Sequence, residues 1–446
     1  MIKLLKEAKV IIEKLNENGY KAYIVGGCVR DYLMGITPVD IDITTDAKPE
    51  EIKDVFSGYK VIETGIKHGT VTVIVDKNQF EVTTFRIDSE YSDNRHPDSV
   101  TFTSNLQEDL ARRDFTMNAI AYNEEEGFFD YFNGIEDIKS KVIRCVGDAD
   151  KRFKEDALRI LRALRFSSVT GFNIEESTEK AIFKNKELLK NISAERVYVE
   201  FSKMLCGDNV KDIILRYTDV LGVVIPELLP MKDFDQRNPH HVYDVLTHSV
   251  IVVESIERKP YLRYAALLHD IGKPHTFSMG EDNLGHFYGH AKVSTSMACD
   301  ILRRLKADNN TISKVEKLIK YHDTPIDNDD VTIKRRLNKI GEEDFFDLIK
   351  LMRADNLGQN PNLLYRQKEY DLIEERAIDI LNEKECFSLK NLNINGEDII
   401  SLGIKEGKEI GSILNSLLDL VISNQIKNEK EELIKSAKLL IEKGLQ

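Results

Sequence analysis

The chain has 446 residues, of which 41% are hydrophobic and 31% are charged. This balance is typical of soluble globular proteins, and the length predicts roughly two to four domains. The net charge of −13 disfavours binding of nucleic acid over the whole surface, although a local basic face could still meet RNA phosphates. The sequence has no apolar run near the roughly 18–20 residues of a membrane-spanning helix, so we expect a cytoplasmic protein without a membrane partner.

The N-terminal segment and the cysteines agree with that expectation. Residues 2–18 follow a helical period with acidic residues inside the apolar pattern, unlike the core of a signal peptide. The cysteines form no CxxC pair, which favours reduced thiols over a zinc ribbon or a disulfide framework. The five are Cys28, Cys145, Cys206, Cys299 and Cys386.

After this helix, strand and helix patterns alternate to about residue 125. A short apolar strand at 22–25 runs directly into a Gly-Gly pair. This alternation predicts a small mixed α/β domain. Further strand-like runs lie at 40–44, 59–64, 70–76 and 81–86.

The Gly-Gly pair stands where the first strand turns into a helix. Without side chains, Gly26 and Gly27 let the backbone approach a phosphate, and N–H groups at a helix start favour an anion. Arg30, one turn later, can add a fork of donors to the same anion. Such turns are also common without a ligand, so a purely structural role stays open at this point.

Two carboxylates follow on the next strand pattern. Asp40 and Asp42 are two residues apart, so in a strand both side chains lie on one face. Ionising both is costly unless a cation lies between them, and hard oxygen ligands suit Mg²⁺ held with substrate phosphates. Glu81, at the start of a later strand, is the best candidate for a third acid. A solvated strand edge and an exposed strand-end glutamate remain the alternatives.

Four ordered motifs then carry a resemblance to a known family. GGxVRD followed by DxD resembles the head motif of the class II tRNA nucleotidyltransferase and bacterial poly(A) polymerase family, within the polymerase-β-like nucleotidyltransferases. The later motifs are DLARRDFTMNAIAY at 109–122, DYFNGIEDI at 130–138 and EDALRILRALRF at 155–166. In this family the second arginine and the aspartate of the second motif meet the incoming nucleotide. The resemblance assigns that role to Arg113 and Asp114.

The last motif can also be interpreted as a helix. At about 100° per residue, its charged residues fall within half the circumference and its apolar residues within the other half. A plain amphipathic helix with an i,i+4 ion pair is the alternative, but three arginines without matching acids predict a bound anion. The charged residues are Glu155, Asp156, Arg159, Arg162 and Arg165, and the apolar ones Ala157, Leu158, Ile160, Leu161 and Leu164.

The resemblance gives this helix a template role. It implies that Asp156 and Arg159 hydrogen-bond the Watson–Crick edge of the incoming base, with Glu155 bracing the arginine. An aspartate accepts from the exocyclic amine of C and A, which G and U lack at that position. Arg162 and Arg165 would face phosphate or base.

The implied reaction is attack of the tRNA 3′-hydroxyl on the α-phosphate of CTP or ATP, with pyrophosphate leaving. Asp40 and Asp42 would hold two Mg²⁺ ions, and Gly27, Arg30 and Arg113 would cradle the triphosphate. No obligate protein partner is implied. A polar, turn-rich stretch at 85–102 is typical of a loop. In the family that the sequence resembles, this stretch is shortened in enzymes that stop after CC, so the resemblance implies addition of the terminal A. We expect complete CCA addition, with A-only addition and polyadenylation as alternatives.

Eight of the ten histidines lie between 240 and 330. Six residues in this region and shortly after it resemble the HD phosphohydrolase pattern, in which imidazoles and a carboxylate hold a transition metal that activates water. A retained scaffold without metal is the alternative. An HD-type phosphohydrolase that only grips RNA with its head, and a non-catalytic RNA-binding protein, are the competing functions. The six are His248, His269, Asp270, His290, His322 and Asp355.

The predicted fold class is α/β plus all-α, with a nucleotidyltransferase head followed by an elongated helical neck, body and tail. Lys405, Gly407 and Lys408, at a predicted helix start in the tail, could meet a tRNA phosphate or could be surface residues only. The predicted divisions are a head at 1–145, a neck at 146–235, an HD-type body at 236–360 and a tRNA-binding tail at 361–446.

Overall fold

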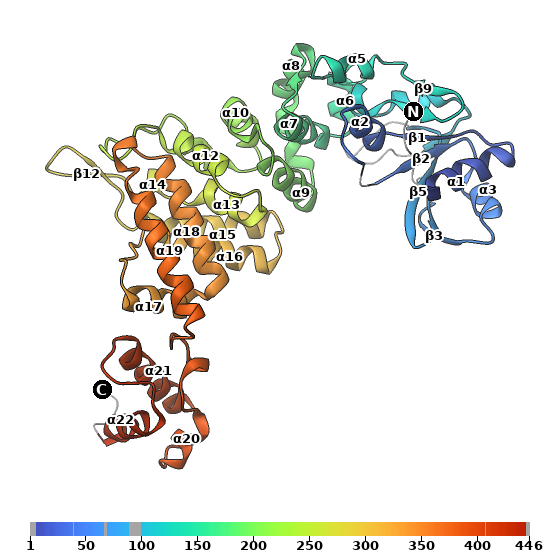
Figure 1. Cartoon of the computed structure of the whole chain (residues 1–446). Coiled ribbons are helices and arrows are strands. Elements are labelled where there is room, and N and C mark those ends of the chain that lie inside the picture. The colour runs from blue at the N-terminus through green and yellow to red at the C-terminus, as the bar shows by residue number, and fades with distance from the viewer. Residues whose placement is uncertain (1–5, 39, 67–68, 89–99, 406, 443–446) are drawn as a thin grey trace. The chain divides into compact units, whose positions relative to one another are not determined.

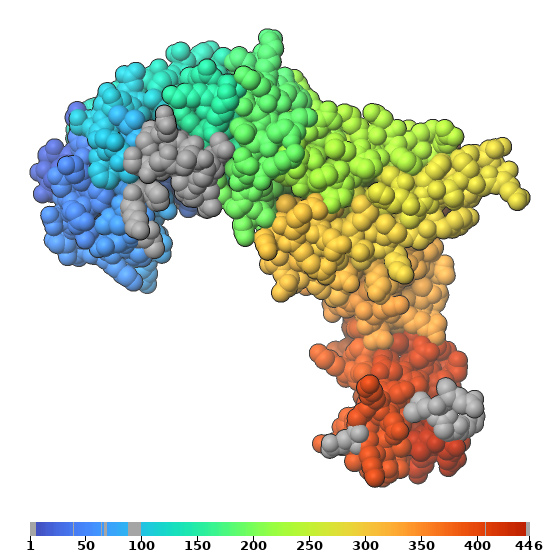
Figure 2. Space-filling model, turned by 180° about the vertical axis from the view of Figure 1, so that it is seen from behind, coloured from blue at the N-terminus to red at the C-terminus, as the bar shows by residue number. Residues whose placement is uncertain are grey.

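The computed structural model describes residues 6–38, 40–66, 69–88, 100–405 and 407–442. The chain divides into two compact units, residues 1–226 and 227–446. Figure 1 labels the elements, and the space-filling view is coloured by residue number in the same way (Figure 2). The finer division into neck, body and tail stays a prediction.

The first unit begins with a seven-stranded mixed sheet in the order β3-β4-β5-β2-β1-β8-β9. All neighbours are antiparallel except β2 and β5, which run parallel. The strand at 22–25 was predicted correctly, and all its residues are buried. The strands are β1 Ala22–Val25, β2 Asp42–Thr45, β3 Lys60–Gly65, β4 Thr70–Val75, β5 Asn78–Thr84, β8 Ala121–Asn123 and β9 Gly127–Phe129.

Strand register places the candidate acids beside the Gly-Gly turn. Asp42 opens β2 opposite Val25, the last residue of β1, and it is aligned with Glu81 on β5. The strand predicted at 40–44 therefore starts two residues late, and Asp40 precedes it. Alternation on β4, with every second residue buried, gives the sheet its apolar face. Helices of this region are α1 Lys6–Glu17, α2 Gly27–Leu33, α3 Pro49–Val55, α4 Leu106–Ala111 and α5 Gly134–Lys139.

The prediction of a loop at 85–102 was wrong at the two ends of this stretch, where two short strands pair with each other. β6 Arg86–Asp88 pairs antiparallel with β7 Val100–Phe102. Local turn residues could not predict this pairing, because the two strands are separated in the sequence and meet only in the fold. Residues 89–99 lie outside the described residues.

Short helices and two short strands complete the first unit. The motif predicted as one helix at 155–166 is two: α6 ends at Glu155, and Asp156 has extended backbone angles (φ −137°, ψ 103°). The Asp156 carboxylate instead accepts a hydrogen bond from the Leu158 N–H at 3.1 Å, which favours a helix start there. The elements are α6 Ala149–Glu155, α7 Leu158–Thr170, α8 Glu176–Asn185, α9 Ala194–Leu205, α10 Val210–Arg216, α11 Thr218–Leu221, β10 Val142–Ile143 and β11 Asn173–Ile174.

The second unit is helical apart from one short hairpin, as predicted. Its last helices bury a separate apolar cluster that includes Ile399, Leu417 and Leu433. In the described part of the chain, no helix is both long and apolar enough to cross a membrane. The elements are α12 Val245–Ser255, α13 Pro260–Leu268, α14 Lys273–Thr276, α15 His290–Arg304, α16 Asn309–Tyr321, α17 Asp330–Ile340, α18 Glu342–Leu357, α19 Arg366–Asn382, α20 Gly396–Ser401, α21 Lys408–Ile422, α22 Lys430–Glu442, β12 Ser278–Met279 and β13 Gly285–His286.

Candidate active site

A pocket of about 410 Å³ opens where the Gly-Gly turn, the start of β2 and helix α7 meet. Both carboxylates and arginines line it, a combination of charges suited to a metal-bound triphosphate. The lining residues are Gly26, Gly27, Cys28, Arg30, Asp31, Asp40, Asp42, Arg113, Asp114, Asn118, Arg162, Arg165 and Phe166.

Gly26 is required by both conformation and space. Its φ of +78° lies in the region that favours glycine. A β-carbon at this position would come within 3.0 Å of Arg113 Nη1 and 4.0 Å of Asp42 Oδ2. The bare backbone thus allows a cation and a carboxylate of the pocket to approach the turn. Gly27 begins α2, as the sequence predicted.

The predicted acids come together at this turn. Asp40 and Asp42 line the same pocket, although Asp40 lies before the strand. Burial raises the pKa of Asp42. The nearby Arg113 guanidinium lowers this pKa, and the carboxylates of Glu81 and Asp40 raise it. Glu81 lines an adjoining cavity that also contains Asp42. The neighbouring carboxylates of Glu81 and Asp40 therefore disfavour ionisation of Asp42, a conflict that a divalent cation relieves.

The second motif supplies a half-buried arginine and a buried aspartate. Arg113 lies near Asp109, with Nη2 3.6 Å from the carboxylate, and burial lowers the pKa of Arg113. Asp114 accepts from Asn118 at 3.0 Å and from Arg162 at 2.8 Å. Burial opposes ionisation of Asp114, but Arg162 and these hydrogen bonds hold its pKa well below the usual range. Both side chains are therefore charged and fixed in place.

The arginines of α7 are paired, contrary to the prediction that they lack matching acids. Arg162 binds Asp114, and Arg165 Nε lies 2.8 Å from Glu200 Oε2. Glu200 is buried on α9 and is also 3.6 Å from Arg162. These acids come from distant parts of the chain, so the local sequence could not reveal them. Arg162 and Arg165 still line the pocket and can face a phosphate.

The two residues expected to bind the base do not line this pocket. Arg159 is buried and donates to the carbonyl oxygen of Arg112 at 2.8 Å and to Glu155 at 2.9 Å. The predicted brace by Glu155 is therefore present. Asp156 Oδ2 accepts from Arg196 of α9 at 2.8 Å. Their hydrogen-bonding groups are engaged within the protein in this conformation.

Sequence reasoning missed three residues of this region. Asn118 accepts from Arg30 at 2.8 Å and donates to Asp114, which joins the Gly-Gly helix to the second motif. Two residues of α9 also bind this region: Glu200 pairs with Arg165 of α7, and Arg196 pairs with Asp156, which directly precedes α7. Asn118 lies inside a motif that the sequence singled out, but no local pattern links α9 to the pocket.

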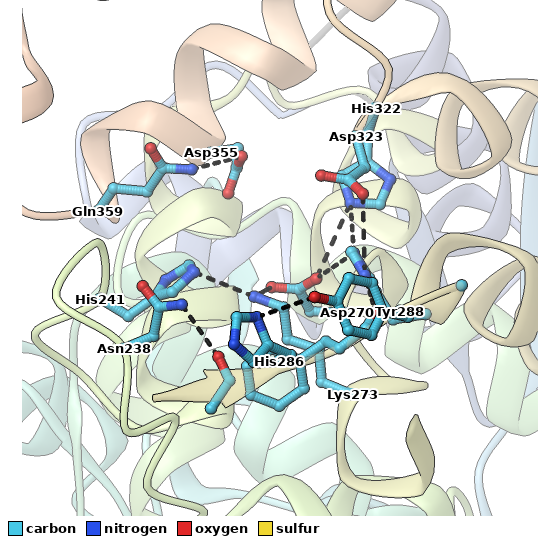
Figure 3. Close-up of a pocket in the computed structure, with 14 residues that line it drawn as sticks. Asn238, His241, Asp270, Lys273, His286, Tyr288, His322, Asp323, Asp355 and Gln359 are labelled. Atoms are coloured by element: carbon cyan, nitrogen blue, oxygen red, sulfur yellow. Dashed lines mark hydrogen bonds and ion pairs between the residues drawn. The ribbon is translucent and has the colours of Figure 1, made fainter. Parts of the chain in front are cut away.

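A second polar site lies in the unit of residues 227–446. It is a pocket of about 300 Å³, and four of the six predicted residues line it: Asp270, His290, His322 and Asp355 (Figure 3). His248, His269 and Asp270 form one group that could hold a metal ion, and Asp270, His290 and His322 form another. Asp270 belongs to both groups.

The first group also contains Asp355. The Nε2 atoms of His248 and His269 are 3.2 Å apart. Asp355 Oδ1 lies 2.9 Å from the first of these nitrogens and 3.4 Å from the second. Asp270 Oδ2 lies 3.4 and 3.2 Å from the same two atoms. Each of the two carboxylate oxygens thus lies within 3.4 Å of both imidazole nitrogens.

The second group uses the other oxygen of the shared aspartate. Asp270 Oδ1 lies 3.3 Å from His290 Nε2 and 3.8 Å from His322 Nε2. The two nitrogens are 3.4 Å apart. Lys273 Nζ contacts Asp270 Oδ2 at 2.7 Å, so the aspartate also has a fixed cationic neighbour.

Backbone carbonyls fix the orientation of all four imidazoles. The Nδ1 atoms lie 2.7 to 3.0 Å from carbonyl oxygens, which can only accept. A proton must therefore lie on Nδ1, so in the neutral form of each ring the unprotonated Nε2 would be the atom turned toward the centre, as in metal sites. The pairs are His248 with Gly358, His269 with Ala266, His290 with Phe287 and His322 with Ile319.

The charges of this cluster also suit a metal. Burial opposes protonation of His269, but Asp270 and Asp355 raise its pKa to about 10. Burial likewise opposes ionisation of Asp270, but His269 and Lys273 hold the pKa of Asp270 well below its usual range. Buried carboxylates without metal are thus balanced by imidazolium, and a divalent cation could take over that role.

A mixed sheet that sets two carboxylates beside an arginine-lined pocket defines the head as a polymerase-β-like nucleotidyltransferase domain. The family model of the poly(A) polymerase head domain matches residues 22–144. The models of an RNA- and SrmB-binding site of polymerase A and of tRNA nucleotidyltransferase domain 2 match residues 171–232 and 280–437.

Comparison with whole proteins gives the family. The chain is 36% identical over 430 residues to the CCA-adding enzyme of Lactobacillus helveticus, which covers 96% of both chains. The CCA-adding enzyme of Anoxybacillus flavithermus is also 36% identical over 430 residues, covering 96% of this chain and 95% of the relative. The chain belongs to the family of CCA-adding enzymes.

Solved structures agree over the full length. The Bacillus stearothermophilus CCA-adding enzyme in complex with CTP has a TM-score of 0.74 at 30% identity and covers 99% of each chain. The Thermotoga maritima CCA-adding enzyme complexed with tRNA has the same fold, with a TM-score of 0.61 at 22% identity over 97% of this chain and 94% of that one.

Proposed function

We propose that this chain adds and repairs the 3′-terminal CCA of tRNA, using CTP and ATP and releasing pyrophosphate. The observation that carries the proposal is the pocket that combines Asp40 and Asp42 with four arginines. Family membership over the full length favours complete CCA addition over A-only addition or polyadenylation.

The acidic part of the pocket fits a divalent cation. Hard carboxylate oxygens beside a triphosphate site favour Mg²⁺, and Asp40 and Asp42 would hold it, with Glu81 as a neighbouring carboxylate. When bound, the ion would polarise the attacking hydroxyl and the transferred phosphate.

The arginines would bind and orient the nucleotide. Arg30, Arg113, Arg162 and Arg165 face the pocket and would neutralise the triphosphate, while Gly27 leaves its backbone open to it. Asp114 holds Arg162 at 2.8 Å and would thereby position this arginine for the phosphates. Positioning of this kind supplies most of the rate enhancement in phosphoryl transfer.

Base selection would require an exchange of partners. Asp156 is bound to Arg196, and Arg159 donates to the carbonyl oxygen of Arg112. A base that donates an amine to Asp156 and accepts from Arg159 replaces part of these contacts, which a U or G edge would do less well.

A product ladder on trimmed tRNA tests this function. Wild-type protein with Mg²⁺ and both nucleotides should extend tRNA by C, C and A. Asp42→Asn should reduce incorporation by at least about a thousandfold, because an amide binds the cation poorly. Asp46→Asn, outside the pocket, is the matched control. Incorporation that survives Asp42→Asn, or none with wild-type protein, would refute the proposal.

The histidine cluster favours a second function, hydrolysis of a phosphate ester at a transition-metal centre. Four imidazoles with free Nε2 atoms and two carboxylates are a donor set that suits Mn²⁺, Fe²⁺, Co²⁺, Ni²⁺ or Zn²⁺. A bound ion would supply an activated water. Lys273, 2.7 Å from Asp270, could bind the phosphate oxygens of the substrate.

Metal analysis and a phosphatase assay test this function. Wild-type protein should retain metal after dialysis and release phosphate from a 2′,3′-cyclic phosphate, and His269→Ala should lose both. His275→Ala, in the same region but outside the cluster, is the control. Absence of bound metal in wild-type protein would support a scaffold role.

A cytoplasmic location follows from these functions, because tRNA, CTP and ATP are found there. Lys405 and Lys408 would meet tRNA near the start of α21, where Gly407 precedes the helix.

A further inference from the structure

One aromatic side chain at the candidate active site has no part in the chemistry described above. Phe166 lies on α7, lines the pocket and is 5% exposed. Its ring packs edge-on against Phe115, with the two ring centres 5.8 Å apart. A buried phenylalanine surrounded by arginines is unusual, because charged guanidinium groups normally lie beside acids or water and not beside an apolar ring.

Three guanidinium groups contact this ring. The central carbons of Arg165, Arg30 and Arg162 lie 3.9, 4.9 and 5.4 Å from its centre. All three distances are within the range of about 6 Å in which an aromatic face attracts a cation. Arg30 comes from α2, whereas the other two belong to α7, so the ring joins cations from separate elements.

Carboxylates and an amide hold the outer edges of the same groups. Arg30 donates to Asp31 and Asn118 at 2.9 and 2.8 Å. Arg162 donates to Asp114, and Arg165 lies 2.8 Å from Glu200. Arg30 and Arg162 are therefore hydrogen-bonded at one edge, Arg165 is ion-paired with Glu200, and all three guanidinium groups contact the ring and line the pocket.

We propose that Phe166 is a positioning residue that holds Arg30, Arg162 and Arg165 together to receive the triphosphate. Like charges this close repel one another, and without nucleotide only the ring and the outer acids oppose that repulsion. The ring adds attraction without a negative charge, so it keeps the three cations together and does not compete with the phosphates for them. The inference rests on the proposed nucleotide binding.

Steady-state kinetics with CTP and ATP on trimmed tRNA test the inference. Phe166→Leu should raise KM for both nucleotides about tenfold and change kcat by less than about twofold, because ring attraction to the cations is lost. Phe166→Tyr keeps the aromatic face and should restore KM to within about threefold of wild type. Phe166→Met, with similar volume and no ring, should resemble the leucine variant.

A second buried phenylalanine separates this effect from lost packing. Phe153 on α6 is fully buried, and no cation is recorded over its ring in the described part of the chain. Phe153→Leu should lower the melting temperature as much as Phe166→Leu but leave KM unchanged. Unchanged KM in both Phe166→Leu and Phe166→Met, or an equal rise in Phe153→Leu, would overturn the inference. Failure of wild-type protein to incorporate either nucleotide would refute the proposed function instead.

Discussion

At the scale of single residues, the turn after β1 depends on a glycine. Gly26 combines φ +78° with a 3.0 Å approach of Arg113 to the position of a β-carbon. Gly26→Ala should lower the free energy of unfolding by about 2 kcal/mol and also raise KM for CTP and ATP. Chemical denaturation and initial rates would measure the two effects.

Gly35 is the matched control for that substitution. It has φ +75°, but nothing lies within 4 Å of its absent β-carbon. Gly35→Ala should therefore lose about 1 kcal/mol and leave KM unchanged. If both variants behaved alike, the contact with Arg113 would have no role in nucleotide binding.

A buried carboxylate near the site should make stability depend on pH. Asp109 is fully buried beside Arg112 and Arg113, and although burial opposes its ionisation, these arginines lower the pKa of Asp109. Because the folded pKa is below the unfolded value of about 4, the stabilisation is present above that value and lost as pH falls.

Asp109→Asn measures this stabilisation. At pH 7 the variant should unfold with about 3 kcal/mol less free energy than wild type, because two arginines lose their charged partner. Thermal melts between pH 5 and about pH 3 should show that this difference in stability shrinks steadily as the pH falls. A constant difference over this range would show that packing, and not charge, is responsible.

At the scale of elements, α9 holds α7 in place through an ion pair. Glu200 is buried and contacts Arg165 and Arg162. Glu200→Gln should cost about 2 kcal/mol of unfolding free energy, since Arg165 would be buried without a charged partner. Glu195→Gln, on the exposed face of the same helix, should change stability by less than about 0.5 kcal/mol. Urea denaturation distinguishes the two.

The same scale shows where sequence patterns succeed. The strand at 22–25 and the apolar face of α7 were predicted correctly, because a fully buried strand appears as a continuous apolar run and a half-buried helix shows its helical period. The helix break at Asp156 was missed. The helical period continues through it, and only the hydrogen bond from the Leu158 N–H to the Asp156 carboxylate marks the new start.

At the scale of the whole molecule, the two candidate sites lie in different units. Asp42→Asn should abolish nucleotide incorporation and leave metal content and ester hydrolysis unchanged. Asp270→Asn should abolish metal binding and ester hydrolysis and leave nucleotide incorporation unchanged, because it alters the carboxylate shared by both metal groups. Both assays on both variants measure this independence, and loss of both activities in either variant would contradict it.

Motifs in the sequence were enough to select candidate residues for the chemistry. Motif order singled out Asp40, Asp42, Arg113 and Asp114, and histidine spacing singled out the cluster around Asp270, because reactive groups must be written at fixed positions in the chain. Only the tertiary structure decided their partners. Asn118, Arg196 and Glu200 bind these groups from other elements. Contacts over long sequence separation leave no local pattern, since they depend on how helices and strands pack.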